Sequence, residues 1–132
     1  MILKESDLNI YMIQGHGIDI VQFTRFNEMD YLRLEKLANR ILTDTELAIF
    51  TELVYSRKTH YVAKIWAAKE AVSKAFGTGI RGDVVWKNMQ VQNDKLGCPK
   101  VEFLNALIDQ GHCHLSISHH GDLLIASAIL EK

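Results

Sequence analysis

The sequence has few cysteines, little net charge and no long apolar run. Its 132 residues include two cysteines, Cys98 and Cys113, which are too few for a disulfide scaffold and form no Cys-x-x-Cys pair. Unpaired thiols of this kind favour a reducing, cytoplasmic setting. The formal net charge is -1, so the composition gives no general electrostatic reason to bind nucleic acid or a membrane surface. No apolar run approaches the roughly 20 residues that a membrane span requires, and none is predicted.

The chain also lacks internal repeats, low-complexity segments and a basic N-terminal segment followed by an apolar core. We therefore expect no secretory signal peptide and a single domain. Hydrophobic residues make up 48% of the sequence, which is enough for a packed core. The polar mixture at the start predicts an N-terminal extension over residues 1–9, followed by one domain over residues 10–132.

The central feature is the stretch from Trp66 to Gly79, which predicts the last turns of a helix and then a glycine-rich loop. Alanine, lysine and glutamate favour helix, and no proline interrupts them. Gly77 is a suitable C-terminal stop, because glycine adopts the left-handed conformation without a Cβ clash. Glu70 and Lys74 are four residues apart and so lie on one helix face. Such a pair is most often an exposed ion pair, and this interpretation stays open beside a functional one.

A strand is predicted over Ile10–Val21, where apolar residues recur. Gly15 and Gly17 interrupt it, which suggests a bulge or the close approach of another backbone or a ligand. Asp19 stands between two isoleucines and therefore points to the opposite face of the sheet. Aspartate is disfavoured in strands, so its presence here needs a reason.

The remaining elements are read from periodicity and turn residues. Further helices are predicted over 23–38, from 43 to about 57, and from 60 onward, and further strands over 84–91, 100–104, 113–119 and 123–130. Thr43 and Glu46 have the spacing of a capping box. The small residues of the last strand, 126–128, suggest close packing on both faces. This order predicts an α+β fold, with helices packed against an antiparallel sheet.

Two carboxylates on rigid elements, Asp19 and Glu70, form a candidate site for one hard divalent cation. Magnesium is usually held by one or two carboxylates together with waters and substrate phosphates. The loop 77–82 has two interpretations, a phosphate-binding loop or simply a helix C-cap. The histidines and cysteine of 112–120 suggest zinc, but neighbouring strand residues point to opposite faces, which favours a structural role.

Three separated segments carry a resemblance to a known family. They are Gly15–Val21 with Arg25 behind it, Trp66–Ile80, and Leu115–His119. Together they resemble the holo-acyl-carrier-protein synthase family of phosphopantetheinyl transferases, and the resemblance extends from about Ile10 to Leu130. It implies the 4′-phosphopantetheinyl transferase fold, assembled as a homotrimer with active sites at subunit interfaces.

The resemblance also implies an activity that depends on magnesium. The 4′-phosphopantetheine arm of coenzyme A would be transferred to a serine of apo acyl carrier protein, with release of adenosine 3′,5′-bisphosphate. The product, holo-acyl carrier protein, supports fatty acid biosynthesis. The two partners expected are therefore coenzyme A as substrate and the acidic carrier protein.

Site residues are carried over by matching positions. Asp19 and Glu70 match the magnesium ligands, and with Lys74 they form the expected catalytic group. The residues expected to bind coenzyme A are Arg40, Lys74, Gly77, Thr78, Gly79 and His119. Arg25 matches a basic residue that docks the carrier protein.

One departure from the family pattern stands in the central helix. Where the family often has Gly-Arg-Phe-Ala-Ala-Lys-Glu, this chain has Ile65 at the arginine position and Lys64 before it. An ammonium group does not reproduce a bidentate guanidinium. Two alternatives therefore stay open: a module that binds coenzyme A or carrier protein without catalysis, and a different magnesium-dependent enzyme that acts on a nucleotide pyrophosphate.

Overall fold

The computed structural model describes residues 2, 10–105 and 111–132. Its elements in chain order are β1 (Ile13–Gln22), α1 (Phe23–Asn27), α2 (Tyr31–Ile41), α3 (Asp44–Glu52), α4 (Tyr55–Ala75), the 3-10 helix η2 (Trp86–Asn88), β2 (Met89–Asn93), β3 (Pro99–Phe103), β4 (His112–His120) and β5 (Leu123–Glu131). Apart from one residue, the predicted extension 1–9 lies outside the described residues, as do residues 106–110 between two of the predicted strands. The division into extension and domain stays a prediction.

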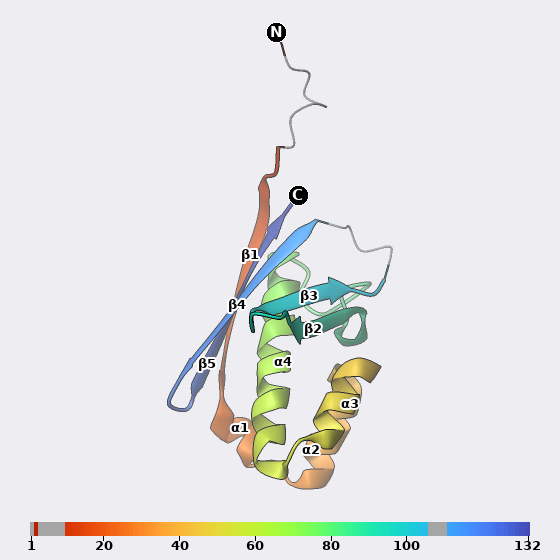
Figure 1. The fold of residues 1–132 in the computed structure, drawn as a ribbon, viewed down its shortest axis with the longest axis vertical. Helices are drawn as coiled ribbons and strands as arrows, with labels where there is room; N and C mark the ends of the chain where they lie inside the picture. The colour runs from red at the N-terminus through yellow and green to blue at the C-terminus, as the bar shows by residue number, and fades with distance from the viewer. Residues whose placement is uncertain (1, 3–9, 106–110) are drawn as a thin grey trace.

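The strands form one five-stranded sheet in the order β1-β5-β4-β3-β2, with antiparallel pairing throughout its described ladders. β4 and β5 are joined by a tight hairpin at Gly121 and Asp122. The helices lie on one side of β1, β5 and β4, and α4 runs along these strands (Figure 1). The predicted α+β arrangement of helices on an antiparallel sheet is therefore confirmed.

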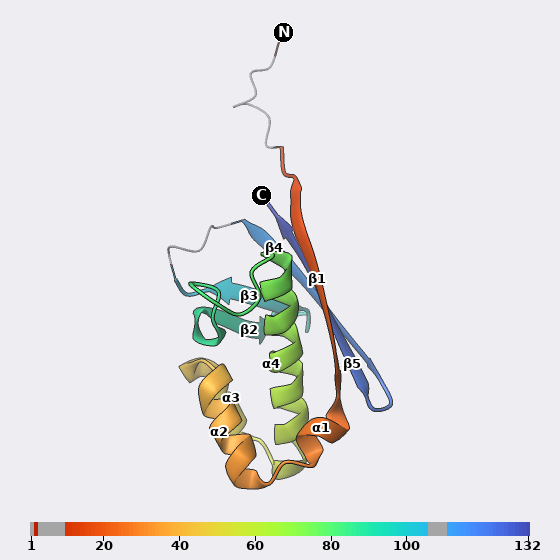
Figure 2. The ribbon, with the colours of Figure 1, turned by 180° about the vertical axis from the view of Figure 1, so that it is seen from behind.

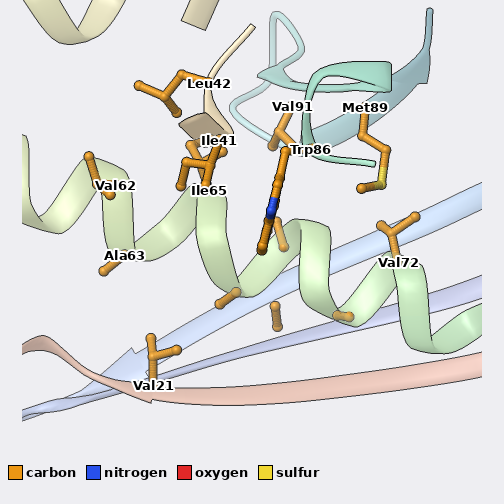
Figure 3. Packing of buried hydrophobic residues seen from close by; sticks show 14 of the residues in the cluster. Val21, Ile41, Leu42, Val62, Ala63, Ile65, Val72, Trp86, Met89 and Val91 are labelled. Carbon is orange, nitrogen blue, oxygen red and sulfur yellow. The ribbon is translucent and has the colours of Figure 1, made fainter. Parts of the chain in front are cut away.

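Helix α4 is the centre of the core, because it is buried on two sides. Its small residues, such as Ala63, face the sheet, whereas Val62, Ile65 and Val72 point to the opposite side (Figure 3). There they meet α2 and the η2–β2 segment, which cover α4 on the side away from β1 and β5 (Figure 2). Because both sides are apolar, α4 lacks the single polar face of a surface helix.

The close approach predicted for the glycines of β1 is confirmed. A Cβ atom placed on Gly15 would lie 1.9 Å from the carbonyl oxygen of Ala75, and one on Gly17 would lie 1.9 Å from that of Ala71. No real side chain tolerates such a contact, so β1 rests against the backbone of α4 only because these positions lack a Cβ. This contact holds the start of the Asp19 segment directly over the last turns of α4.

Several predicted boundaries are wrong, each for a local reason. The helix predicted over 23–38 is two helices, because Asp30 caps α2 by accepting a hydrogen bond from the backbone N–H of Arg33 at 2.8 Å. The next helix ends at Glu52 instead of near residue 57, and α4 begins at Tyr55 instead of 60, because the intervening backbone is extended. The strand predicted from residue 84 is preceded by η2.

The predicted burial of both faces of β5 is also wrong for the single chain. Burial alternates along this strand: Leu124, Ala126 and Ala128 are buried against α4. Ile125 and Ile129 point away from the helix and remain partly exposed. Of the two faces of β1 and β5, one is therefore covered by α4, and the other is open and carries exposed isoleucines.

A buried ion pair connects α3 to α4. The predicted capping box at Thr43 is confirmed, and its Glu46 carboxylate is fully buried. The Lys69 ammonium donates to Glu46 Oε1 at 2.6 Å and to the backbone carbonyls of Ile41 and Trp86. The other carboxylate oxygen accepts the backbone N–H of Val91 at 2.6 Å. All three ammonium protons and both oxygens are thus satisfied, as a buried pair requires.

Candidate active site

Asp19 lies on the covered face of β1, opposite the exposed isoleucines on either side of it, as predicted. The Lys74 ammonium of α4 donates to Asp19 Oδ1 at 3.1 Å and to the carbonyl oxygen of Ile18 at 3.0 Å. The second carboxylate oxygen, Oδ2, is buried and has no hydrogen-bond partner within the described chain. A buried acceptor without a donor is costly, so this oxygen is suited to a ligand that the chain itself does not supply.

Glu70 lies close to this pair. Burial and the negative charge of Asp19 raise the pKa of Glu70, while the positive charges of Lys74 and Arg25 lower it in part. The carboxylate forms no ion pair or hydrogen bond with any other described side chain. Two carboxylates therefore repel each other across a partly desolvated gap, and a cation between them would relieve that repulsion.

The exposed Glu70–Lys74 ion pair suggested by the four-residue spacing is not what forms. Lys74 instead pairs with Asp19, whose side chain is only 14% exposed. The helix thus presents its lysine to the strand and leaves the glutamate oxygens available. This arrangement favours the functional interpretation of the spacing over the structural one.

The donor set fits magnesium. Asp19 Oδ2 and the Glu70 carboxylate are hard oxygen ligands on a strand and a helix, and magnesium commonly takes two carboxylates and completes its shell with waters and phosphate. No group of three or more histidine, cysteine or acidic residues gathers into a metal site in the part of the chain described. Among the histidines of β4, His114 pairs instead with Glu131 at 3.2 Å, so the zinc interpretation gains no support.

Arg25 reaches the same region from α1. Its guanidinium carbon lies 5.1 Å from the ring centroid of Trp66. Its positive charge lowers the pKa of Glu70 in part. Arg25 and Arg33 line one hollow of about 590 Å³ over α1 and the start of α2. Arg25 therefore brings a positive charge from this hollow to the neighbourhood of Glu70.

His119 lies on β4, beside a second hollow of about 530 Å³. Its ring meets the edge of Phe23 at 6.2 Å between centroids, and Phe23 stacks on His60 at 4.2 Å. Arg57 and Lys64 of α4 also line this hollow. Arg57 and His60 were missed from the sequence, although their spacing with Lys64 at three and four residues already places them on one helix face.

The glycine loop acts as a helix cap. Gly77 and Gly79 both have positive φ angles, and their N–H groups donate to the carbonyls of Lys74 and Ser73. Those two N–H groups are therefore occupied, which favours the C-cap interpretation over a phosphate cradle at these atoms. The Thr78 hydroxyl donates a hydrogen bond to the carbonyl oxygen of Gly79. Arg40 is exposed on the last turn of α2, and no contact seen in the described chain joins it to the carboxylates.

Comparison with known proteins places this geometry in a family. The family model of the 4′-phosphopantetheinyl transferase superfamily matches residues 15–128. The chain belongs to this superfamily. The match covers most of the strand of Asp19, the whole helix of Glu70 and most of the β4–β5 hairpin, so all the candidate site residues lie within it.

Individual members of the superfamily resemble this chain in both sequence and structure. The holo-[acyl-carrier-protein] synthase of Streptococcus pyogenes serotype M1 is 42% identical over 120 residues, covering 91% of this chain and 98% of that protein. The crystal structure of the synthase from Neisseria meningitidis has a TM-score of 0.82 at 37% identity, covering 92% of this chain and 100% of that one. The synthase from Bacillus anthracis, solved in complex with CoA (3′,5′-ADP), has a TM-score of 0.80 at 40% identity and covers 92% and 98%.

These comparisons confirm the family and fold that the sequence predicted, and with them the transferase class. The roles of individual site residues stay predictions. Within the ranges that the structure describes, no helix has the length and apolar character needed to cross a membrane.

Proposed function

We propose that this phosphopantetheinyl transferase moves the 4′-phosphopantetheine arm of coenzyme A to a serine of apo acyl carrier protein, using magnesium held by Asp19 and Glu70. The observation that carries the proposal is the pairing of these two carboxylates, 51 positions apart in sequence, beside the Lys74 ammonium. The names of the relatives, which are holo-[acyl-carrier-protein] synthases, support the choice of substrates.

The chain's own residues position charge around the reacting phosphate. When bound, magnesium would supply several kcal/mol of stabilisation to charge that builds on phosphate oxygens. Lys74, fixed by Asp19 and the Ile18 carbonyl, places a second positive charge on the same side. Arg25 adds a third from α1. Phosphoryl transfer depends mostly on such positioning and electrostatic stabilisation, so rigid elements that carry these groups suit the reaction.

One assay separates this function from its alternatives. The protein is mixed with apo acyl carrier protein, coenzyme A and magnesium, and the intact mass of the carrier is recorded. A gain of one phosphopantetheine supports transfer. Binding without any gain in mass would favour a non-catalytic module, and breakdown of coenzyme A without modification of the carrier would favour a pyrophosphate hydrolase.

The proposal includes a homotrimer with active sites between subunits. The face of β1 and β5 that points away from α4 carries exposed isoleucines, with Ile18 54%, Ile20 57% and Ile125 39% exposed. These residues are neighbours, because Ile20 pairs with Ile125 across the β1–β5 ladder. An apolar sheet face of this kind marks an association surface, and it is continuous with the strand that carries Asp19.

The interface prediction concerns Ile125. We expect Ile125→Glu to dissociate the assembly, because it places a charge in the middle of this face. Molar mass measured by light scattering after size exclusion tests this. The matched control is Leu32→Glu, at an apolar residue 61% exposed on α2, which should leave the mass unchanged. A wild-type protein that is monomeric at micromolar concentration would contradict the trimer.

The second surface prediction concerns Arg25. Acyl carrier proteins are acidic, and Arg25, whose charge lowers the pKa of Glu70, shares a hollow with Arg33. We expect Arg25→Glu to weaken carrier binding at least about tenfold and to reduce its association rate most at low salt, since rim charges act through steering. Coenzyme A binding should change much less. Both affinities are measured by surface plasmon resonance, with Lys95→Glu in the exposed β2–β3 turn as the charge-matched control.

The proposed setting is the cytoplasm, where holo-acyl carrier protein supports fatty acid biosynthesis. Cys98 is an exposed free thiol, and Cys113 is also unpaired. A reducing compartment keeps such thiols free, which supports this location.

A further inference from the structure

Helix α1 has no N-terminal cap of its own. It contains only five residues, and Gln22 at its N-cap position forms no side-chain hydrogen bond with it. No acidic residue stands in its first turn to complement the helix dipole. A helix this short is unstable by itself, because its first turn fixes several residues for one hydrogen bond. The position of α1, and of Arg25 on it, therefore depends on contacts from other elements.

Asp122 supplies these contacts from the turn between β4 and β5. Its Oδ1 accepts the backbone N–H of Thr24 at 2.9 Å, and its Oδ2 accepts the Thr24 hydroxyl at 2.6 Å. Its backbone carbonyl accepts the N–H of Phe23 at 2.8 Å. A residue 98 positions from Thr24 in sequence thus performs the task of an N-cap, and its carboxylate lies at the positive end of the helix dipole.

The turn that carries Asp122 is held by the sheet. Leu123 pairs with His120 in the β4–β5 ladder and with Gln22 in the β1–β5 ladder. The short turn Gly121–Asp122 therefore lies beside the end of β1, which is where α1 begins. A turn of this length has few accessible conformations, so Asp122 is a rigid attachment point for the start of the helix.

Helix α1 carries two side chains that depend on its position in different degrees. Phe23 is buried, and its ring stacks on His60 at 4.2 Å between centroids, so core packing holds it in place. Arg25 is exposed and extends over the Trp66 ring, and it lines the 590 Å³ hollow together with Thr24. Loss of the Asp122 contacts should therefore displace Arg25 more than Phe23.

We propose that Asp122 is a positioning residue for the carrier protein, because it holds the first turn of α1 in the conformation that presents Arg25. In this role Asp122 acts through Thr24 and Arg25 and does not itself contact the carrier. The inference rests on the proposed function, since it takes an acidic carrier protein as the partner of Arg25.

Charge and position predict opposite results when Asp122 is removed. Asp122 is an exposed acidic residue, so by charge alone it repels an acidic carrier, and its removal would strengthen carrier binding. If Asp122 instead positions Arg25, its removal weakens carrier binding. The sign of the change in carrier affinity therefore separates the two roles.

The test is the Asp122→Ala variant in the transfer assay. We expect KM for the apo carrier to rise about fivefold, which is the typical effect of losing a helix N-cap. Both kcat and KM for coenzyme A should stay within about twofold of wild type. Asp122→Asn should retain the wild-type KM for the carrier, because the amide oxygen accepts the Thr24 N–H and the amide nitrogen donates to the hydroxyl. Asp44→Ala, at an exposed position of α3, removes an equal charge and should leave this KM unchanged.

Carrier affinity measured by surface plasmon resonance adds a readout that does not depend on transfer. With Arg25→Gln already present, Asp122→Ala should weaken carrier binding no further, because the two residues act through one contact. Additive losses, an equal loss of coenzyme A affinity, or stronger carrier binding by Asp122→Ala would each overturn the positioning role.

The outcomes also distinguish this inference from the proposed function. A wild type that transfers phosphopantetheine, together with an unchanged KM for the carrier in Asp122→Ala, would overturn the role of Asp122 and keep the transferase. A wild type that binds the acidic carrier but transfers nothing, and whose binding Asp122→Ala weakens, would overturn the proposed function and keep the positioning role.

Discussion

Replacing Asp19 by asparagine is expected to abolish phosphopantetheine transfer while the fold persists. The substitution keeps the size of the side chain but removes the negative charge beside Glu70 and the buried acceptor oxygen Oδ2. Because a bound metal supplies several kcal/mol of transition-state stabilisation, kcat should fall roughly a thousandfold, which is about 4 kcal/mol. The measurement is the initial rate of carrier modification at saturating coenzyme A and magnesium.

Stability should change little in this variant. The Asp19–Lys74 ion pair has a lysine side chain that is 49% exposed, and pairs of this kind contribute less than about 1 kcal/mol. Glu70→Gln should match the loss of rate, because both ligands are needed for one cation. Glu52→Gln, at an exposed position at the end of α3, is the control and should be fully active. Full activity of the Asp19 or Glu70 variant at ordinary magnesium concentration would contradict the metal assignment.

The local part of this site follows from sequence patterns. A two-residue period placed Asp19 on the face opposite its isoleucine neighbours, and the strand glycines indicated a close backbone approach that Ala71 and Ala75 provide. Gly77 ends α4 as its freedom at positive φ predicts. Each of these depends on residues within a few positions of one another, where conformational preferences act directly.

The long-range part does not follow from such patterns. Spacing alone does not bring Asp19 and Glu70 together; that expectation came from the family resemblance. Spacing even favoured the wrong partner for Lys74, since the four-residue rule describes an isolated helix and ignores the strand that crosses it. The same applies to Arg57 and His60, whose role depends on Phe23 and His119 arriving from other elements.

The burial and ion pairing of Lys69 could not be predicted from the sequence. In the printed sequence it stands next to Glu70 among alanines, which resembles an ordinary solvated position on a helix. Its side chain is fully buried, because the charge is satisfied by Glu46 and by two backbone carbonyls from distant segments. No periodicity signals a partner 23 positions away in the capping box of another helix.

Substitution of this lysine should therefore give the largest loss of stability. We expect Lys69→Met to lower the free energy of unfolding by about 3–5 kcal/mol, because it leaves the buried Glu46 charge without its counter-ion. A domain of this size has a total stability of about 5–15 kcal/mol, so the variant should unfold at a much lower denaturant concentration. Urea titration measures the free energy of unfolding. Both proteins are titrated at the same concentration, because the apparent stability of an assembling protein depends on its concentration.

The control and the double variant distinguish a charge effect from a packing effect. Lys36→Met, at an exposed position of α2, should cost less than about 0.5 kcal/mol. Adding Glu46→Gln to Lys69→Met should recover part of the loss, because the unpaired charge is then gone, although the amide serves the backbone N–H groups of Thr43 and Val91 less well than the carboxylate. The single variant Glu46→Gln is measured as well. If the loss of stability in the double variant equals the sum of the losses in Lys69→Met and Glu46→Gln, the ion pair is not what stabilises this junction of α3, α4 and β2.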